Sequence, residues 1–456
     1  MSRQSRLPFE LDHEIDDTLI TAHAGVPLLI ELFRTCGAAQ VMDERASPKQ
    51  RRRGLTAAET AESLFALWAS GGERCEDLDR LREDRALAEL LGHELPSAQA
   101  ARDFLAAFHE EDLPLLQAGG KAQVPQEAEV LQGLVAVSGQ VVRHLQHHRP
   151  STVATLDVDA TVLECDKRAA KPVYDGRRGY QPVFVLWAEQ DVILADEFRD
   201  GNVPAGSGNL RVVEKALAAV PPGVEQVFVR GDSALYEHPL LDALAGRGIG
   251  FAISADMSQA LHAAIVALPE QAWHPDREET DAFRQWAEVA YVPDQGRPAV
   301  PHRYLAIRIL KKQGTLFADG SDRRHFSIVT NRQGDGLEIL RWHRGKAGTV
   351  EHTHDVLTNE LAAEALPSQK FGANATWVRL NVILYNLLSA LKRLTLPEEF
   401  HTARPKKLRF LLFNTVGRIV RHARETLLRL ASALTRALFD AARVKIHALS
   451  PPLLGV

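Results

Sequence analysis

The feature that most constrains the fold is a change of hydrophobic pattern near residue 152. Upstream, apolar residues recur at helical spacing, for example from Val26 to Phe33. Downstream, from Thr155 to Leu163, polar and apolar residues alternate, which indicates a strand with one polar face. We therefore expect a helical region over 1–149 and a domain boundary near Pro150.

The elements after this strand predict a mixed sheet. Two apolar runs, Val183–Trp187 and Val192–Ala195, flank a short polar segment and predict a hairpin. Next come a predicted helix over 210–220, a strand over 226–230, a helix over 236–247 and a strand over 249–253. The order βββαβαβ predicts that the later strands are parallel, as in RNase H-like domains.

We expect an α/β fold with an RNase H-like mixed sheet and flanking helices, interrupted by a β-rich insertion, plus helical regions at both ends. The first part of the core is expected at 150–255. Strand-like runs dominate at 256–331 and predict the insertion, whereas helical spacing returns at 332–400, the second part of the core. The last region, 401–456, is expected to form basic helices.

Composition and charge narrow the class of protein. The 456 residues are 45% hydrophobic and 25% charged, which excludes a disordered chain. The net charge is −5, but residues 391–456 hold 13 Lys+Arg against 4 Asp+Glu, a net of +9, and the remainder carries −14. A basic tail of this kind is compatible with polyanion binding, and equally with an incidentally basic helical surface.

Cysteine spacing and hydropathy indicate the cellular compartment. Cys36, Cys75 and Cys165 lie far apart without CxxC spacing, which argues against a disulfide scaffold and a thiolate zinc site. No run of about 18 apolar residues occurs. We expect a cytoplasmic protein without a membrane span, and we expect the apolar run from Trp377 to Leu388 to be a buried core helix.

Acidic residues at predicted strand ends are the candidate chemical groups. Asp159 lies near the end of the first strand, and Asp232 directly follows the strand expected beside it. Side chains at the carboxyl ends of adjacent parallel strands converge, and carboxylate oxygens suit Mg²⁺ or Mn²⁺. Each aspartate could instead cap a turn, and Asp157, on the same face as Asp159, remains an alternative.

A third acid is expected from a later helix. Glu351 and Asp355 lie four residues apart and so share a helix face. The preceding segment is basic and contains Arg344 and Lys346, cations that could hold a phosphate against the acids. The alternative is a solvent-exposed amphipathic helix with incidental charges.

Several motifs in order resemble the DDE transposases of bacterial insertion sequences, and most closely the insertion sequence 1380 type. The motifs are Leu156-Asp-Val-Asp-Ala-Thr161, Tyr174-Asp-Gly-Arg-Arg-Gly-Tyr-Gln-Pro182, Val229-Arg-Gly-Asp-Ser-Ala234, Lys346-Ala-Gly-Thr-Val-Glu351 and Phe371-Gly-Ala-Asn-Ala-Thr-Trp377. The resemblance runs from about residue 10 to 400. It implies Asp159, Asp232 and Glu351 as catalytic, metal-binding residues, with two Mg²⁺ ions per site and Mn²⁺ as a substitute.

The tyrosine and arginine signature of the broad superfamily is imperfect here. His343 and Lys346 keep its spacing, but both residue types differ and both lie one residue further from Glu351 than usual. The role of the basic partner is therefore less defined by the resemblance than that of Glu351.

The resemblance implies an enzyme that binds insertion-sequence ends, cleaves them and joins their 3'-hydroxyl groups to target DNA. Its expected partners are double-stranded DNA, as terminal inverted repeats and target, and further copies of itself in a homodimer or higher oligomer. The 1–149 region is expected to bind DNA or dimerise, and the protein to lie at the bacterial nucleoid, without membrane contact. Candidate DNA-binding residues are Arg51, Arg52, Arg53, Arg344 and Lys346. The alternative is an RNase H-like nuclease or DNA-binding protein without strand transfer.

Overall fold

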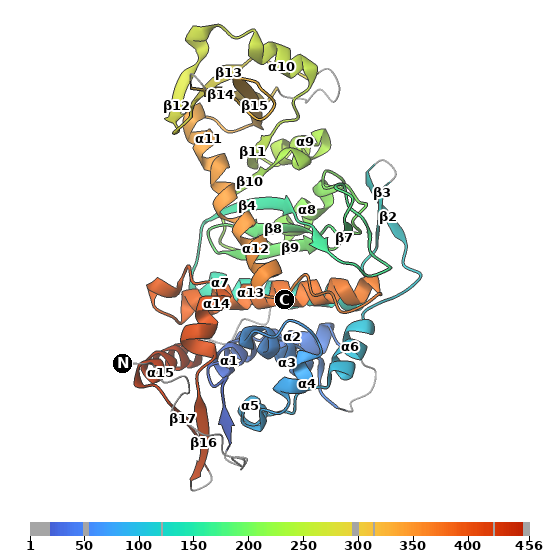
Figure 1. The fold of residues 1–456 in the computed structure, drawn as a ribbon, viewed down its shortest axis with the longest axis vertical. Coiled ribbons are helices and arrows are strands. Elements are labelled where there is room, and N and C mark those ends of the chain that lie inside the picture. The colour runs from blue at the N-terminus through green and yellow to red at the C-terminus, as the bar shows by residue number, and fades with distance from the viewer. Residues whose placement is uncertain are drawn as a thin grey trace, which may run out of the picture.

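The computed structural model describes residues 19–48, 54–119, 122–293, 301–312, 315–422 and 425–449. Its centre is a nine-stranded mixed sheet with the strand order β12-β13-β14-β15-β11-β10-β4-β8-β9. Two long helices, α7 (Glu129–His148) and α13 (Phe371–Leu394), run across the middle of the molecule (Figure 1). The sheet lies on one side of these helices in that view, and the N-terminal helices lie on the other.

The predicted core strands and helices are present in the expected order. The strands are β4 (Val153–Ala160), β8 (Val183–Trp187), β9 (Val192–Glu197), β10 (Gln226–Gly231) and β11 (Gly250–Ser254), with α8 (Asn209–Ala219) and α9 (His238–Gly246) between the later ones. β10 pairs in parallel with both β4 and β11, whereas β8 pairs antiparallel with β4 and with β9. The predicted mixed sheet with parallel later strands is therefore confirmed.

The region expected as a β-rich insertion extends the core sheet. It contains α10 (Gln259–Val266), β12 (His274–Glu278), β13 (Ala282–Val289), β14 (Arg303–Lys311) and β15 (Arg323–Thr330). These strands pair antiparallel in sequence order, and β15 joins β11 with Ile253 opposite Val329. The chain then returns to the core through α11 (Gly336–Arg344) and α12 (Val350–Glu360).

The N-terminal region is mainly helical, as expected. Its helices are α1 (Pro27–Thr35), α2 (Ala38–Arg45), α3 (Ala57–Ser70), α4 (Asp77–Leu81), α5 (Arg85–Leu91), α6 (Ala98–Ala106) and α7. Local sequence sets the ends of α3: Thr56 and Glu59 form a capping box, and Gly71 ends the helix at φ 105°. It also contains β1 (Ile20–Thr21) and a hairpin of β2 (Leu115–Gly119) and β3 (Ala122–Pro125), which the helical pattern did not predict.

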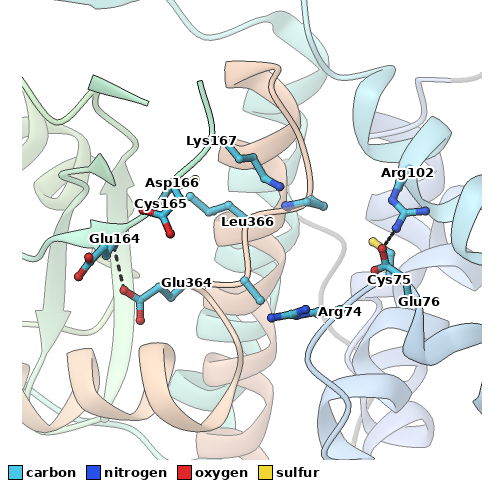
Figure 2. A pocket seen from close by; sticks show the side chains of 12 residues that line it. Arg74, Cys75, Glu76, Arg102, Glu164, Cys165, Asp166, Lys167, Glu364 and Leu366 are labelled. Atoms are coloured by element: carbon cyan, nitrogen blue, oxygen red, sulfur yellow. Dashed lines mark hydrogen bonds and ion pairs between the residues drawn. The ribbon is translucent and has the colours of Figure 1, made fainter. Parts of the chain in front are cut away.

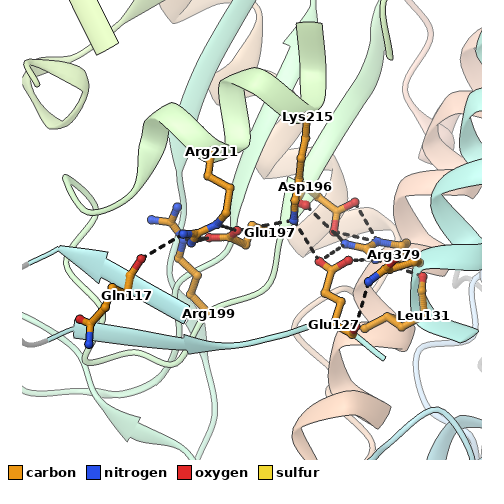
Figure 3. Close-up of polar contacts among 10 residues, drawn as sticks. Gln117, Glu127, Leu131, Asp196, Glu197, Arg199, Arg211, Lys215 and Arg379 are labelled. Atoms are coloured by element: carbon orange, nitrogen blue, oxygen red, sulfur yellow. Dashed lines mark hydrogen bonds and ion pairs between the residues drawn. The ribbon is translucent and has the colours of Figure 1, made fainter. Parts of the chain in front are cut away.

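Helix α13 is the central packing element. Its residues from Gly372 to Lys392 are buried, which confirms the prediction of a core helix. Trp377 packs edge-on against Trp68 of α3, with ring centroids 4.7 Å apart. The buried guanidinium of Arg379 bridges Glu127 and Asp196, and so ties α13 to the segment before α7 and to β9 (Figure 3).

The C-terminal region differs from the expected set of helices. It contains α14 (Pro405–Leu408), a π-helical turn (Arg409–Phe413), the strands β16 (Gly417–His422) and β17 (Glu425–Leu430), and α15 (Ala433–Ala448). β16 pairs with both β17 and β1, and α15 contacts α1. The first and the last segments that the structure describes therefore pack together.

A pocket of about 460 Å³ lies where the N-terminal helices approach the core (Figure 2). It is lined by Arg74, Cys75 and Arg102 on one side and by Cys165, Lys167 and Glu364 on the other. Cys36, Cys75 and Cys165 are free and buried. Among the described helices, none is long and apolar enough to cross a membrane.

Candidate active site

Asp157 and Asp159 lie on the same strand but in different environments. Asp157 is fully buried, and its carboxylate accepts hydrogen bonds from Arg230 at 2.6 and 2.7 Å and from the hydroxyl of Thr349. Asp159, near the end of β4, keeps 15% of its side chain exposed. The protein itself thus satisfies the Asp157 carboxylate, whereas Asp159 can reach a ligand.

Asp232 lies beside Asp159 at the same edge of the sheet. Gly231 is opposite Val158 in the parallel β4–β10 pair, so the next residue on each strand is an aspartate. Asp232 Oδ1 also accepts a hydrogen bond from the Ala234 amide at 3.0 Å and caps a short 3₁₀ turn, Ser233–Leu235. The sequence left two roles open for Asp232, a turn cap or an acid at the end of a strand. The structure shows that it has both positions at once.

Burial raises the pKa of Asp232, and the neighbouring Asp159 carboxylate raises it further, whereas the positive charge of Lys346 lowers it. The Lys346 ammonium lies 3.2 Å from Asp159 Oδ2. Lys346 belongs to a short 3₁₀ segment, Gly345–Gly348, that links α11 to α12. The positively charged Lys346 therefore lies just before α12, the helix of Glu351, and contacts Asp159 of β4.

His343 fixes the end of α11 against the Asp232 strand. Its Nε2 donates a hydrogen bond to the Gly231 carbonyl oxygen at 3.0 Å, which requires the tautomer with hydrogen on Nε2. Burial lowers the pKa of His343, and the positive charges of Lys346 and Arg230 add to this effect. His343 is therefore a neutral donor that positions the backbone next to Asp232.

Glu351 occupies the first turn of α12 and is exposed. Within the described ranges, no three Asp, Glu, His or Cys side chains are close enough to hold a metal ion. The structure thus brings together two of the three predicted acids, and the third does not complete an ion site with them. Asp355, the other candidate on this helix, is held by Arg404 at 2.5 Å and by Asn359 at 2.6 Å.

Two residues near the acids were missed from the sequence. Arg230 pairs with Asp157 and stacks on the Trp342 ring, 5.1 Å from its centroid. Asp256, just after β11, has a pKa raised by burial and by the charge of Asp232. The sequence did contain a signal for Arg230, because a single charged residue inside an apolar strand needs a buried partner of opposite charge.

The five residues predicted to bind DNA differ in the contacts that the structure shows for them. Arg51, Arg52 and Arg53 lie outside the described residues. The Arg344 guanidinium holds both oxygens of Asp276 in β12, at 2.5 and 2.9 Å. Lys346 contacts Asp159.

The oxygen donors of Asp159 and Asp232 fit a hard divalent cation. The carboxylates of Asp159 and Asp232 repel one another. In the metal-free protein, the Lys346 ammonium offsets that repulsion. A divalent cation would meet the same electrostatic need with more charge. The donor set therefore fits a metal ion, with Lys346 as its competitor for Asp159.

Comparisons with known proteins found similarity over almost the whole chain. A family model described as "Transposase DDE domain group 1" matches residues 10–451. No curated protein matches the sequence. Among solved structures, a piggyBac transposase in a synaptic complex with hairpin DNA is similar at 10% identity, over 94% of this chain and 86% of that chain, with a TM-score of 0.47.

Proposed function

Because the chain belongs to the Transposase DDE domain group 1 family, we propose that it cleaves the ends of a mobile DNA element and joins their 3'-hydroxyl groups to target DNA. The observation that supports this most directly is the position of Asp159 and Asp232 at adjacent places on parallel strands. Family membership supports a DNA transposase that depends on a divalent metal. The insertion sequence 1380 type, strand transfer, and the preference for Mg²⁺ over Mn²⁺ are our proposals.

We assign Asp159, Asp232 and Glu351 as the metal-binding acids. When bound, two Mg²⁺ ions would activate the attacking oxygen and stabilise the leaving oxygen of an in-line displacement. Asp159, Asp232 and Glu351 would together supply the carboxylate oxygens that hold the ions. Glu351 is exposed in the first turn of α12, so its side chain is not fixed by packing.

Neighbouring residues fix the backbone around the strand ends that carry Asp159 and Asp232. The Asp157–Arg230 pair fixes β4 against β10, and the hydroxyl of Thr349 binds the same carboxylate just before α12 begins. His343 holds the backbone that precedes Asp232. These contacts support the backbone next to Asp159 and Asp232, and we propose that Lys346 exchanges Asp159 for a phosphate oxygen during the reaction.

Duplex DNA is the proposed partner, as terminal repeats and as target. Two ends must be held at once for coupled cleavage and joining, so we propose a homodimer or a higher oligomer. The helices of 1–149 are the proposed region for DNA binding and dimerisation. The core at 150–255 and 332–400, with its insertion at 256–331, would carry the chemistry at the nucleoid.

One experiment separates this function from a nuclease on the same fold. Duplexes from the DNA that flanks the coding region are labelled at the 5' end of the strand whose 3'-hydroxyl is to be joined, and are incubated with the protein, Mg²⁺ and a supercoiled plasmid. Joined plasmid products support the proposal, whereas cleavage without joining supports the nuclease. Asp159→Ala and Asp232→Ala should abolish both reactions and leave duplex binding intact.

A further inference from the structure

A groove of about 960 Å³ lies beside the helix that carries Glu351. One side is formed by Glu360, near the end of α12, and the other by the segment from Thr402 to Asn414. That segment comprises α14 and the π-helical turn, and α14 contacts α12 directly. The function proposed above assigns no role to this groove.

The groove is fixed to α12 by three contacts. Arg404 pairs with Asp355 and with Glu360, each at 2.5 Å, and the Lys406 amide donates to Glu360 Oε2 at 2.7 Å. Nine residues separate Glu351 from Glu360, which at a rise of about 1.5 Å per residue is about 13 Å along the helix. That length corresponds to about four steps of B-DNA at about 3.4 Å each.

The groove presents two exposed lysines. Lys406 and Lys407 are exposed, and within the described ranges neither ammonium forms an ion pair. The Lys407 ammonium lies over the Phe400 ring, 5.7 Å from its centroid. Arg404 is paired with two carboxylates, so the positive charge available to a ligand comes from the two lysines and from Arg409, which also lines the groove and donates to backbone carbonyl oxygens.

An aromatic side chain stands beside these cations. Phe410 is 84% exposed, whereas Leu408 and Leu412 on either side of it are fully buried. The π-helical turn produces this arrangement, and π-helical turns are frequent at functional sites. Arg409 anchors the turn because its guanidinium donates to the Trp68 carbonyl oxygen at 2.7 Å. Phe410 is therefore held in solvent by a rigid support.

We propose that this groove binds the sugar–phosphate backbone of duplex DNA next to the bond that is cleaved. Lys406 and Lys407 contact phosphates, and Phe410 packs against a deoxyribose or a base edge. Unpaired cations beside an apolar surface match a polyanion that also carries apolar sugars. The inference rests on the proposed function for its DNA ligand, and it adds a binding surface at the opposite end of the helix that carries Glu351.

The test is duplex binding by the full chain without divalent metal. Fluorescence anisotropy with a labelled 40-base-pair duplex is measured between about 50 and 200 mM KCl. For the double variant Lys406→Ala and Lys407→Ala, the slope of log K against log[KCl] should fall by about 1.8, because each phosphate contact contributes about 0.9. Phe410→Ala should weaken binding at least about fivefold and leave the slope unchanged.

Matched controls lie on α15. Arg436→Ala with Lys445→Ala removes the same charge from an exposed helix, and Leu434 has the same 84% exposure as Phe410. These controls should keep the wild-type slope and affinity. An equal loss of slope in the α15 double variant, or an unchanged slope in the groove variant, overturns the proposal. Thermal unfolding midpoints equal to wild type establish that each variant is folded.

The two proposals fail in different ways. If the wild-type protein cleaves and joins DNA while the groove variants bind and react as it does, the groove proposal is wrong and the proposed function stands. If the wild-type protein binds duplex DNA through the groove but produces neither cleavage nor joining with Mg²⁺, the proposed function is wrong and the groove stands.

Discussion

The ammonium nitrogen of Lys346 lies 3.2 Å from Oδ2 of Asp159, with 10% and 15% of the two side chains exposed. A pair this sheltered from water interacts more strongly than a surface pair. Because Asp232 is adjacent, the lysine also offsets the repulsion between two carboxylates. The protein without metal therefore uses its own cation where a divalent ion is proposed to bind.

Replacing Lys346 should show whether the lysine and a divalent ion compete for Asp159. Lys346→Met should destabilise the metal-free protein by about 1–3 kcal/mol, because it leaves sheltered acids without a partner. Mg²⁺ should then raise the thermal unfolding midpoint more in the variant than in wild type, since the ion no longer displaces a lysine. Differential scanning fluorimetry with and without Mg²⁺ measures both effects.

Lys215 provides the control for that experiment. Its ammonium lies 3.6 Å from both Glu127 and Glu197, in the charge network near α13 (Figure 3). Lys215→Met should change the response to Mg²⁺ little. Equal Mg²⁺ shifts in wild type and Lys346→Met would show that the lysine and the ion do not compete.

The Asp157–Arg230 pair should matter to folding far more than an exposed pair. Asp157 is fully buried and Arg230 is 5% exposed, so Arg230→Met leaves an uncompensated buried carboxylate. We expect a loss of about 3–5 kcal/mol in the free energy of unfolding. Arg177→Met, which breaks exposed pairs with Asp175 and Glu164, should have little effect on the free energy of unfolding, because water screens surface ion pairs. Urea unfolding of both variants measures the difference, and equal losses would contradict the assignment.

His144 should make stability depend on pH. Burial lowers its pKa to about 4, from an ordinary value of 6.5, and among the described residues neither ring nitrogen has a hydrogen-bond partner. Because the unfolded chain binds a proton more tightly, the free energy of unfolding should fall as the pH falls from 6.5 to about 4. His144→Leu should remove this part of the loss.

Unfolding in urea at pH 5 and pH 8 tests this prediction. The gain of the His144→Leu variant over wild type should be larger at pH 5, where the native histidine opposes protonation. A gain that is the same at both pH values would show that His144 keeps its ordinary pKa in the native protein.

The sequence predicted local features well and long-range partners poorly. The alternation around Asp159 and the strand before Asp232 follow from neighbouring residues, and both were predicted. The pairing of Asp157 with Arg230 joins positions 73 residues apart, and no periodic pattern encodes it. Strand β17 (Glu425–Leu430) is rich in residues that favour helices, so its propensity opposes the hairpin that pairing with β16 imposes.

The third acid can be assigned by a comparison within one helix. Glu351 and Asp355 lie four residues apart on α12, but Asp355 is paired with Arg404, whereas Glu351 is exposed at the helix start near Lys346. If Glu351 holds a metal ion, Glu351→Gln should reduce DNA cleavage by on the order of 10⁴-fold without changing duplex affinity.

Asp355→Asn is the matched control, because it removes a charge one turn away. It should retain cleavage and cost less than about 1 kcal/mol of stability, since its ion pair with Arg404 is partly exposed. Gel analysis of cleavage and anisotropy of binding measure the two activities separately. Wild-type cleavage by Glu351→Gln together with loss of cleavage in Asp355→Asn would transfer the role to Asp355, because both carboxylates share one face of the same helix.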